Sequence, residues 1–63
     1  MLDFCKEVLL KVSFDRQLFR KELIKMRDML KQDDALLLKV WCLATFGAQY
    51  ADVVREVFMY TSA

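Results

Sequence analysis

The stretch ALLLKVWCLATFGA, residues 35–48, decides the fold of this chain because it is apolar almost without interruption. Lys39 is its only charged residue, and nothing in the stretch alternates with the period of two that marks a half-buried strand. We therefore expect a helix here. A helix that is apolar on every side is normally buried, so this one needs cover all round. That cover must come from the rest of the chain or from another molecule.

The length and composition of the chain make it difficult to bury this apolar helix with residues of the same chain. The 63 residues are expected to form a single domain, 1–63, and a domain of this size buries only about 60% of its unfolded surface. Hydrophobic residues make up 57% of the chain, against about 45–50% in typical soluble domains. Small domains usually gain stability from disulfides, a metal or oligomerisation. Two distant cysteines, Cys5 and Cys42, and the lack of histidine leave oligomerisation as the expected solution.

Helical periodicity throughout, with no proline, predicts an all-α compact bundle of four short helices. Their expected ranges are about 3–12, 15–31, 34–46 and 49–60. Gly47 is expected to adopt the left-handed conformation that ends the third helix. The alternative is that the last two helices are continuous across Gly47, since a glycine inside a helix costs only about 1 kcal/mol.

Short polar side chains mark the expected helix starts. Asp3, Asp15, and Asp33 or Asp34 are the predicted N-caps, with Ser13 as the alternative to Asp15. Phe14 and Phe19 have the spacing of a hydrophobic staple around Asp15. These signals place the turns near residues 13–15 and 31–34.

Most helices have a clear inward stripe. The predicted inward residues are Cys5, Val8, Leu9 and Val12 in the first helix, Phe19, Leu23, Met26 and Leu30 in the second, and Tyr50, Val53, Val54 and Val57 in the last. In the apolar third helix we place Leu37, Val40, Trp41 and Ala44 inward, and Ala35, Lys39, Cys42 and Phe46 on the opposite side.

The opposite side of the third helix is the predicted interface. The candidate surface for a second copy or a helical protein partner consists of Lys39, Cys42 and Phe46. It also includes Leu18 and Met29, which lie outside the inward stripe of the second helix. The alternative is that one compact core hides nearly all of this material while Lys39 extends to water.

Basic residues make the second candidate surface. Arg16, Arg20, Arg27 and Lys31 share one face of the second helix and could contact phosphates or an acidic partner. The alternative is a solvated helix face, stabilised by pairs three residues apart such as Lys25–Asp28 and Asp28–Lys31.

The residue types in this chain give little support for a catalytic function. Without histidine or a glycine-rich phosphate loop we expect no catalytic, cofactor or metal-binding residues and no small-molecule substrate. The net charge of +1 implies no bulk attraction to nucleic acid, and the apolar stretch is too short for a membrane span. No basic segment leads into an apolar one at the first residues, so a reducing, cytoplasmic location is expected.

These observations favour a small non-catalytic protein–protein interaction module that self-associates, most simply as a homodimer, through surplus apolar helix surface. The alternative function is a small nucleic-acid-binding regulator that uses the basic face of the second helix. No motif in the chain is specific enough to indicate a family.

Overall fold

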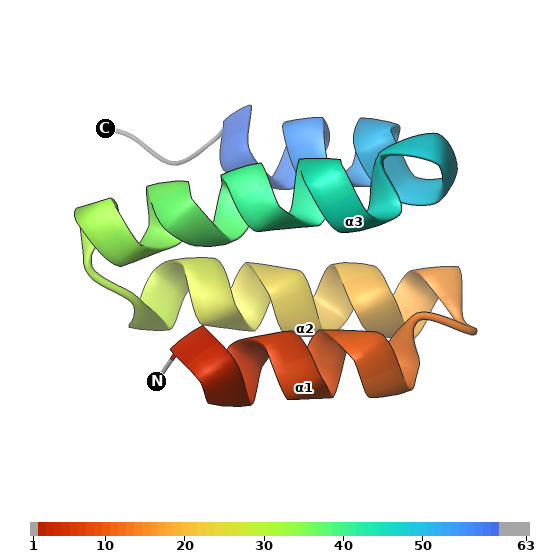
Figure 1. Cartoon of the computed structure of the whole chain (residues 1–63), viewed down its shortest axis with the longest axis horizontal. Coiled ribbons are helices and arrows are strands. Elements are labelled where there is room, and N and C mark those ends of the chain that lie inside the picture. Colours follow the sequence, from red (N-terminus) through yellow and green to blue (C-terminus); the bar gives the residue numbers. More distant parts are fainter. Residues whose placement is uncertain (1, 60–63) are drawn as a thin grey trace.

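The computed structural model describes residues 2–59 and contains an all-α bundle of three helices in that range. They are α1 (Leu2–Val12), α2 (Arg16–Met29) and α3 (Gln32–Met59). Helices α1 and α2 run antiparallel, and α3 turns back on itself so that its two halves lie side by side (Figure 1). The predicted all-α bundle is confirmed. The third and fourth predicted helices are merged into α3, which is the continuous alternative.

The turn within α3 involves two residues with non-helical backbone angles. Phe46 has φ −115° and ψ 16°, and Tyr50 has φ −129° and ψ 23°. The prediction of a left-handed Gly47 is wrong, because no residue from 2 to 59 has a positive φ. The helix therefore bends at two residues that flank the glycine instead of ending at it.

The predicted helix starts are partly correct. Asp15 caps α2, and its carboxylate accepts hydrogen bonds from the backbone N–H groups of Gln17 and Leu18 at 3.0 and 3.2 Å. Asp3, Asp33 and Asp34 are not N-caps, because α1 begins at Leu2 and α3 at Gln32. These three carboxylates lie in first turns, where they still interact favourably with the helix dipole.

Two further boundary predictions need correction. Helix α2 ends at Met29 and not at 31, because Leu30 has an extended backbone. The hydrophobic staple is wrong: Phe14 is 79% exposed, while Phe19 is fully buried in the core. The predicted end of the last helix at residue 60 lies outside the described residues.

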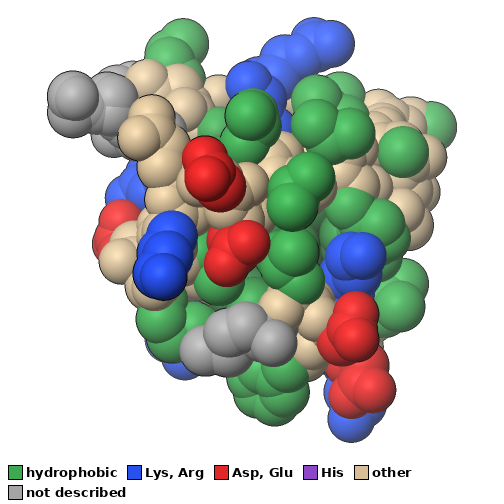
Figure 2. All heavy atoms as spheres, turned by 60° about the vertical axis from the view of Figure 1, so that its left-hand side comes forward, with side chains coloured by type: hydrophobic (Ala, Val, Ile, Leu, Met, Phe, Trp, Pro, Cys, Tyr) green, Lys and Arg blue, Asp and Glu red, His purple; other side chains and the backbone are tan. Residues whose placement is uncertain are grey.

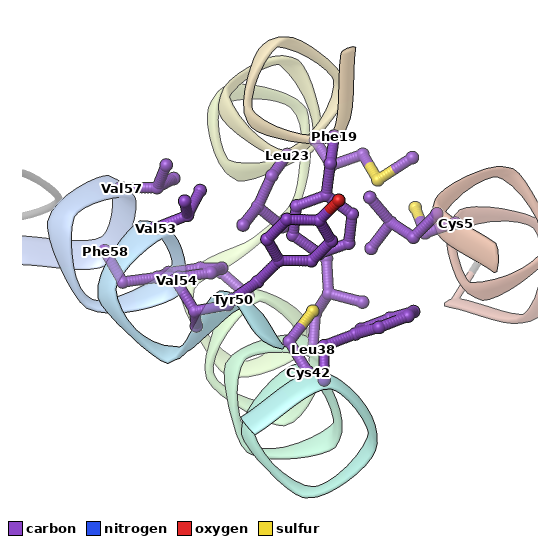
Figure 3. Close-up of a cluster of buried hydrophobic side chains, with 14 residues drawn as sticks. Cys5, Phe19, Leu23, Leu38, Cys42, Tyr50, Val53, Val54, Val57 and Phe58 are labelled. Carbon is purple, nitrogen blue, oxygen red and sulfur yellow. The ribbon is translucent and has the colours of Figure 1, made fainter. Parts of the chain in front are cut away.

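The core is built from all three helices and matches most of the predicted stripes. Its buried residues are Cys5, Leu9, Phe19, Leu23, Met26, Ala35, Leu38, Cys42, Phe46, Tyr50, Val53, Val54, Val57 and Phe58. The stripes of α1, α2 and the second half of α3 are confirmed, with Val8, Val12 and Leu30 packed at the edge. Figure 3 shows these side chains converging from the surrounding helices.

The predicted orientation of the first half of α3 is wrong. Its buried residues are Ala35, Leu38, Cys42 and Phe46, whereas Leu36, Leu37 and Val40 are exposed and Trp41 is half-buried. An aromatic cluster accounts for this choice: the Phe46 ring packs edge-on against Phe19 with centroids 4.9 Å apart. The side that we expected to face a partner is therefore the side that closes the core.

Candidate interaction surface

The surface that now lacks cover is the outward face of α3, defined as Leu36, Leu37, Val40 and Ala44. Leu36, Leu37 and Val40 are each 58–59% exposed, and Ala44 is also exposed. Leu37, Val40 and Ala44 follow Leu36 by one, four and eight residues, so all four lie on the same side of the helix. Lys39 is the only charged residue from Ala35 to Ala51, and it is half-buried. The outward face is therefore an apolar surface without a charge of its own.

Half-buried residues border this face. Trp41 packs against the core and against the Phe46 ring, with centroids 5.5 Å apart, and the Lys6 ammonium lies 5.7 Å from its ring centre. Leu43 is half-buried as well. Trp41 thus presents part of a large aromatic side chain beside the outward face, held in place by α1 and α3.

Other exposed hydrophobic residues are distributed over the bundle. Figure 2 shows hydrophobic side chains adjoining one another on the visible surface, with charged side chains among them. The large ones outside α3's outward face are Phe4, Leu10, Phe14, Leu18, Met29 and Met59. Exposed apolar residues are ordinary when single, so the grouping within one helix face sets Leu36, Leu37 and Val40 apart.

The structure does not bring the predicted interface residues together. Cys42 is fully buried and Phe46 is 6% exposed, so neither is available to a partner while the bundle is folded. Lys39 is half-buried on α3, and Leu18 and Met29 are exposed on α2. Leu37 and Val40, which the sequence predicts to be inward, form the exposed surface together with Leu36.

A signal for the correct orientation was present in the sequence. Cys42, Phe46 and Tyr50 are each four residues apart and continue into Val53 and Val57 of the predicted last stripe. In one continuous helix, this spacing places Cys42 and Phe46 on the same side as Tyr50. Two helices that are separate at Gly47 have no such connection.

The predicted basic face is largely occupied by the end of α3. Arg16 pairs with Asp52, and Arg20 Nη2 lies 3.0 Å from Glu56 Oε2. The hydrogen bond that Arg16 donates holds the pKa of Asp52 below its usual value. Lys31 is exposed and makes no ion pair within residues 2–59.

Arg27 has the most enclosed guanidinium of this set. Its Nη1 donates a 2.7 Å hydrogen bond to the backbone carbonyl of Val57, and Nη2 lies 3.0 Å from Asp28. Val57 is close to the end of α3, where helix carbonyls lack partners within the helix. Arg27 thus acts as a side-chain cap for α3, which gives it a structural role.

The predicted pairs three residues apart on α2 are replaced by others. Lys25 Nζ lies 3.5 Å from Glu22 Oε1, and Asp28 is paired with its neighbour Arg27. The predicted Lys25–Asp28 and Asp28–Lys31 pairs are therefore wrong. The exposed Lys25–Glu22 pair contributes little to stability in water.

The two thiols are free and buried. Burial raises the pKa of both, and that of Cys42 reaches about 12. A nucleophilic or metal-binding cysteine needs an accessible thiolate, so the packing of these residues favours a structural role. Within residues 2–59, no three His, Cys, Asp or Glu side chains are grouped to hold a metal ion. No helix in the same range is both long and apolar enough to cross a bilayer.

Comparisons of this chain with protein-family models, with curated proteins and with solved structures found no match. The outward face of α3 and the arginines bound to its C-terminal end are the two surface features of the described residues that could contact another molecule. They differ in one respect: the arginines have partners within the chain, and the outward face has none among residues 2–59.

Proposed function

We propose that this chain is a small non-catalytic protein–protein interaction module that self-associates through the outward face of α3. One observation carries the proposal: Leu36, Leu37 and Val40 lie together on one helix face and keep 58–59% of their surface exposed. A contiguous apolar surface of this kind typically marks an interface.

The energetics require more than these three side chains. Burying a whole leucine or valine side chain contributes about 1.5–3 kcal/mol, and just over half of each is available here. Association itself costs roughly 4–15 kcal/mol. A standard interface covers about 800 Å² per partner, which is about a fifth of the 4303 Å² surface of the chain. The contact must therefore extend to bordering residues. Trp41 is one of them, and tryptophan is among the residue types most often central to such contacts.

A second copy is the proposed partner because it presents the same uncharged surface. A two-fold axis pairs such a face with itself, so that each residue meets an apolar residue of the other copy. The net charge of +1 makes the repulsion between two copies weak. The cytoplasm is the proposed location, where two free thiols are maintained in the reduced state.

The nucleic-acid alternative receives no comparable support. Arg16, Arg20 and Arg27 each contact a partner on α2 or α3, and releasing them for phosphates would remove contacts that hold the end of α3. Lys31 alone does not make the stripe of several cations that phosphate binding needs.

A charge placed on the outward face tests the proposal. In Leu37→Glu, a carboxylate would have to be desolvated on association, so the dimer should dissociate at concentrations where wild type is dimeric. Sedimentation over a concentration series measures the effect. Leu10→Glu is the matched control, because Leu10 is similarly exposed but lies on α1. A wild type that stays monomeric at high micromolar concentration, or equal weakening by both variants, would contradict the proposal.

A further inference from the structure

The last part of α3, residues 51–59, is held against α2 by side-chain contacts and is here termed the C-terminal arm. Three of these contacts involve α2 arginines: Arg16 with Asp52, Arg20 with Glu56, and Arg27 with the carbonyl of Val57. Any second copy of the chain presents the same α2 surface. The arm could therefore make each of these contacts equally well with another molecule.

The arm also needs a core to dock into. Val53, Val54, Val57 and Phe58 are all buried, and Figure 3 shows them pointing from the arm toward the side chains of α2 and of the first half of α3. An isolated helix shorter than about 12–15 residues is marginal in water. The arm is shorter than that, so it is stable when docked, whether in its own bundle or in another.

The hinge that connects the arm to the first half of α3 can become helical through backbone rotation at two residues. Only Phe46 and Tyr50 depart from helical angles, and both keep a negative φ and a small positive ψ. Neither proline nor a left-handed residue is present between them. Rotating these two residues into the helical region would produce one straight helix from Gln32 to Met59, about 42 Å long.

We propose that two copies of this chain exchange their C-terminal arms, with α3 straightened at Phe46 and Tyr50. Each arm then docks on the α2 of the other copy and restores the same ion pairs and the same buried residues. Exchange of an identical element is a low-cost route to a dimer, because few contacts are new. The exchange rests on the proposed self-association, since contact through the outward face brings two copies together and the arms then join them.

The residues around the hinge are compatible with the crossing that this exchange requires. The two straightened helices pass each other near the two-fold axis, where large side chains would hold them apart. Ala44, Gly47, Ala48 and Ala51 are small residues along this part of α3. Close approach of two backbones at this point is therefore sterically possible.

A cross-link between α2 and the arm distinguishes the two forms. In the full chain with Arg20→Cys and Glu56→Cys, a short bismaleimide joins sites that face each other across α2 and the arm. The native thiols are buried and should not react. A closed monomer gives an intrachain link and a 7.5 kDa band on a denaturing gel, whereas exchanged arms give a band of twice that mass. We expect the double-mass band at high micromolar concentration, and a weaker one when Leu37→Glu is added.

Two controls make the result decisive. Single variants Arg20→Cys and Glu56→Cys, unfolded and refolded together, should yield a double-mass product only if arms are exchanged. Inserting two glycines between Gly47 and Ala48 should reduce that product by roughly tenfold or more, because each glycine disfavours the straight helix. A dimer in sedimentation that gives only intrachain links would retain the outward-face proposal and overturn the exchange. An interchain product unaffected by the inserted glycines would also overturn it, provided that circular dichroism shows the variant folded.

Discussion

Cys42 lies at a position where a charge is especially costly. It is fully buried, and burial raises the pKa of its thiol from 9.0 to about 12. In the unfolded chain the thiol loses its proton near pH 9, while in the folded chain it keeps the proton up to about pH 12. The folded state therefore binds more protons in this window, so the free energy of unfolding should fall by up to about 1.4 kcal/mol per pH unit. Below pH 9 the thiol is neutral in both states and the full stability remains.

Urea denaturation of wild type and of Cys42→Ala at several pH values measures this effect. All other ionisable groups are common to both proteins. The difference between the two stability curves therefore isolates the thiol. It should be constant below pH 9 and shrink steadily between pH 9 and 12. Parallel curves throughout would show that Cys42 ionises as freely in the folded chain as in the unfolded one.

Single residues also show why the basic surface could not be assigned from the sequence. Arg16 and Arg20 meet carboxylates 36 positions away, and Arg27 meets a carbonyl 30 positions away. Local spacing identifies which residues share a helix face, and this part was correct for the first three arginines. It contains no information on which element covers that face.

At the scale of the element, the bend in α3 makes a specific prediction for Gly47. Its φ is negative, and a Cβ atom at this position has no neighbour within 4 Å. Gly47→Ala should therefore be tolerated and should raise the free energy of unfolding by about 0.4–1 kcal/mol, because it reduces the freedom of the unfolded chain. Thermal and urea denaturation provide the measurement. A loss of stability instead would indicate the left-handed glycine that the sequence suggests.

The elements differ in how well their orientation can be predicted. In α1, α2 and the C-terminal arm, charged residues occupy one side of the helix, so the buried side follows from the pattern. Asp52, Arg55 and Glu56, for example, leave Val53 and Val57 as the inward residues. The first half of α3 has apolar residues on all sides, so periodicity does not distinguish the inward side. In this part of α3, the buried side is determined by aromatic packing against Phe19. This is a contact between two helices, which periodicity within one helix does not reveal.

At the scale of the whole molecule, one aromatic side chain joins the parts of the bundle. Phe19 of α2 packs against Phe46 at 4.9 Å and stacks on Tyr50 at 4.4 Å between ring centroids. Tyr50 in turn donates a 2.6 Å hydrogen bond to the carbonyl of Ser13, in the turn between α1 and α2. The bend of α3, the first turn of α2 and the turn between α1 and α2 therefore depend on the same cluster.

A truncation in this cluster should unfold the whole chain. Stabilities of about 0.05–0.15 kcal/mol per residue imply roughly 3–9 kcal/mol for a chain of 63 residues. Phe19→Ala removes a fully buried ring and should cost about 3–5 kcal/mol, a large fraction of that total. Phe14→Ala is the matched control, since the same truncation at a side chain that is 79% exposed removes little packing. Circular dichroism melts should show Phe14→Ala close to wild type, and Phe19→Ala largely unfolded at room temperature or melting far lower. If Phe19→Ala melted within a few degrees of wild type, the bundle would have to be held by its peripheral contacts and not by the cluster around Phe19.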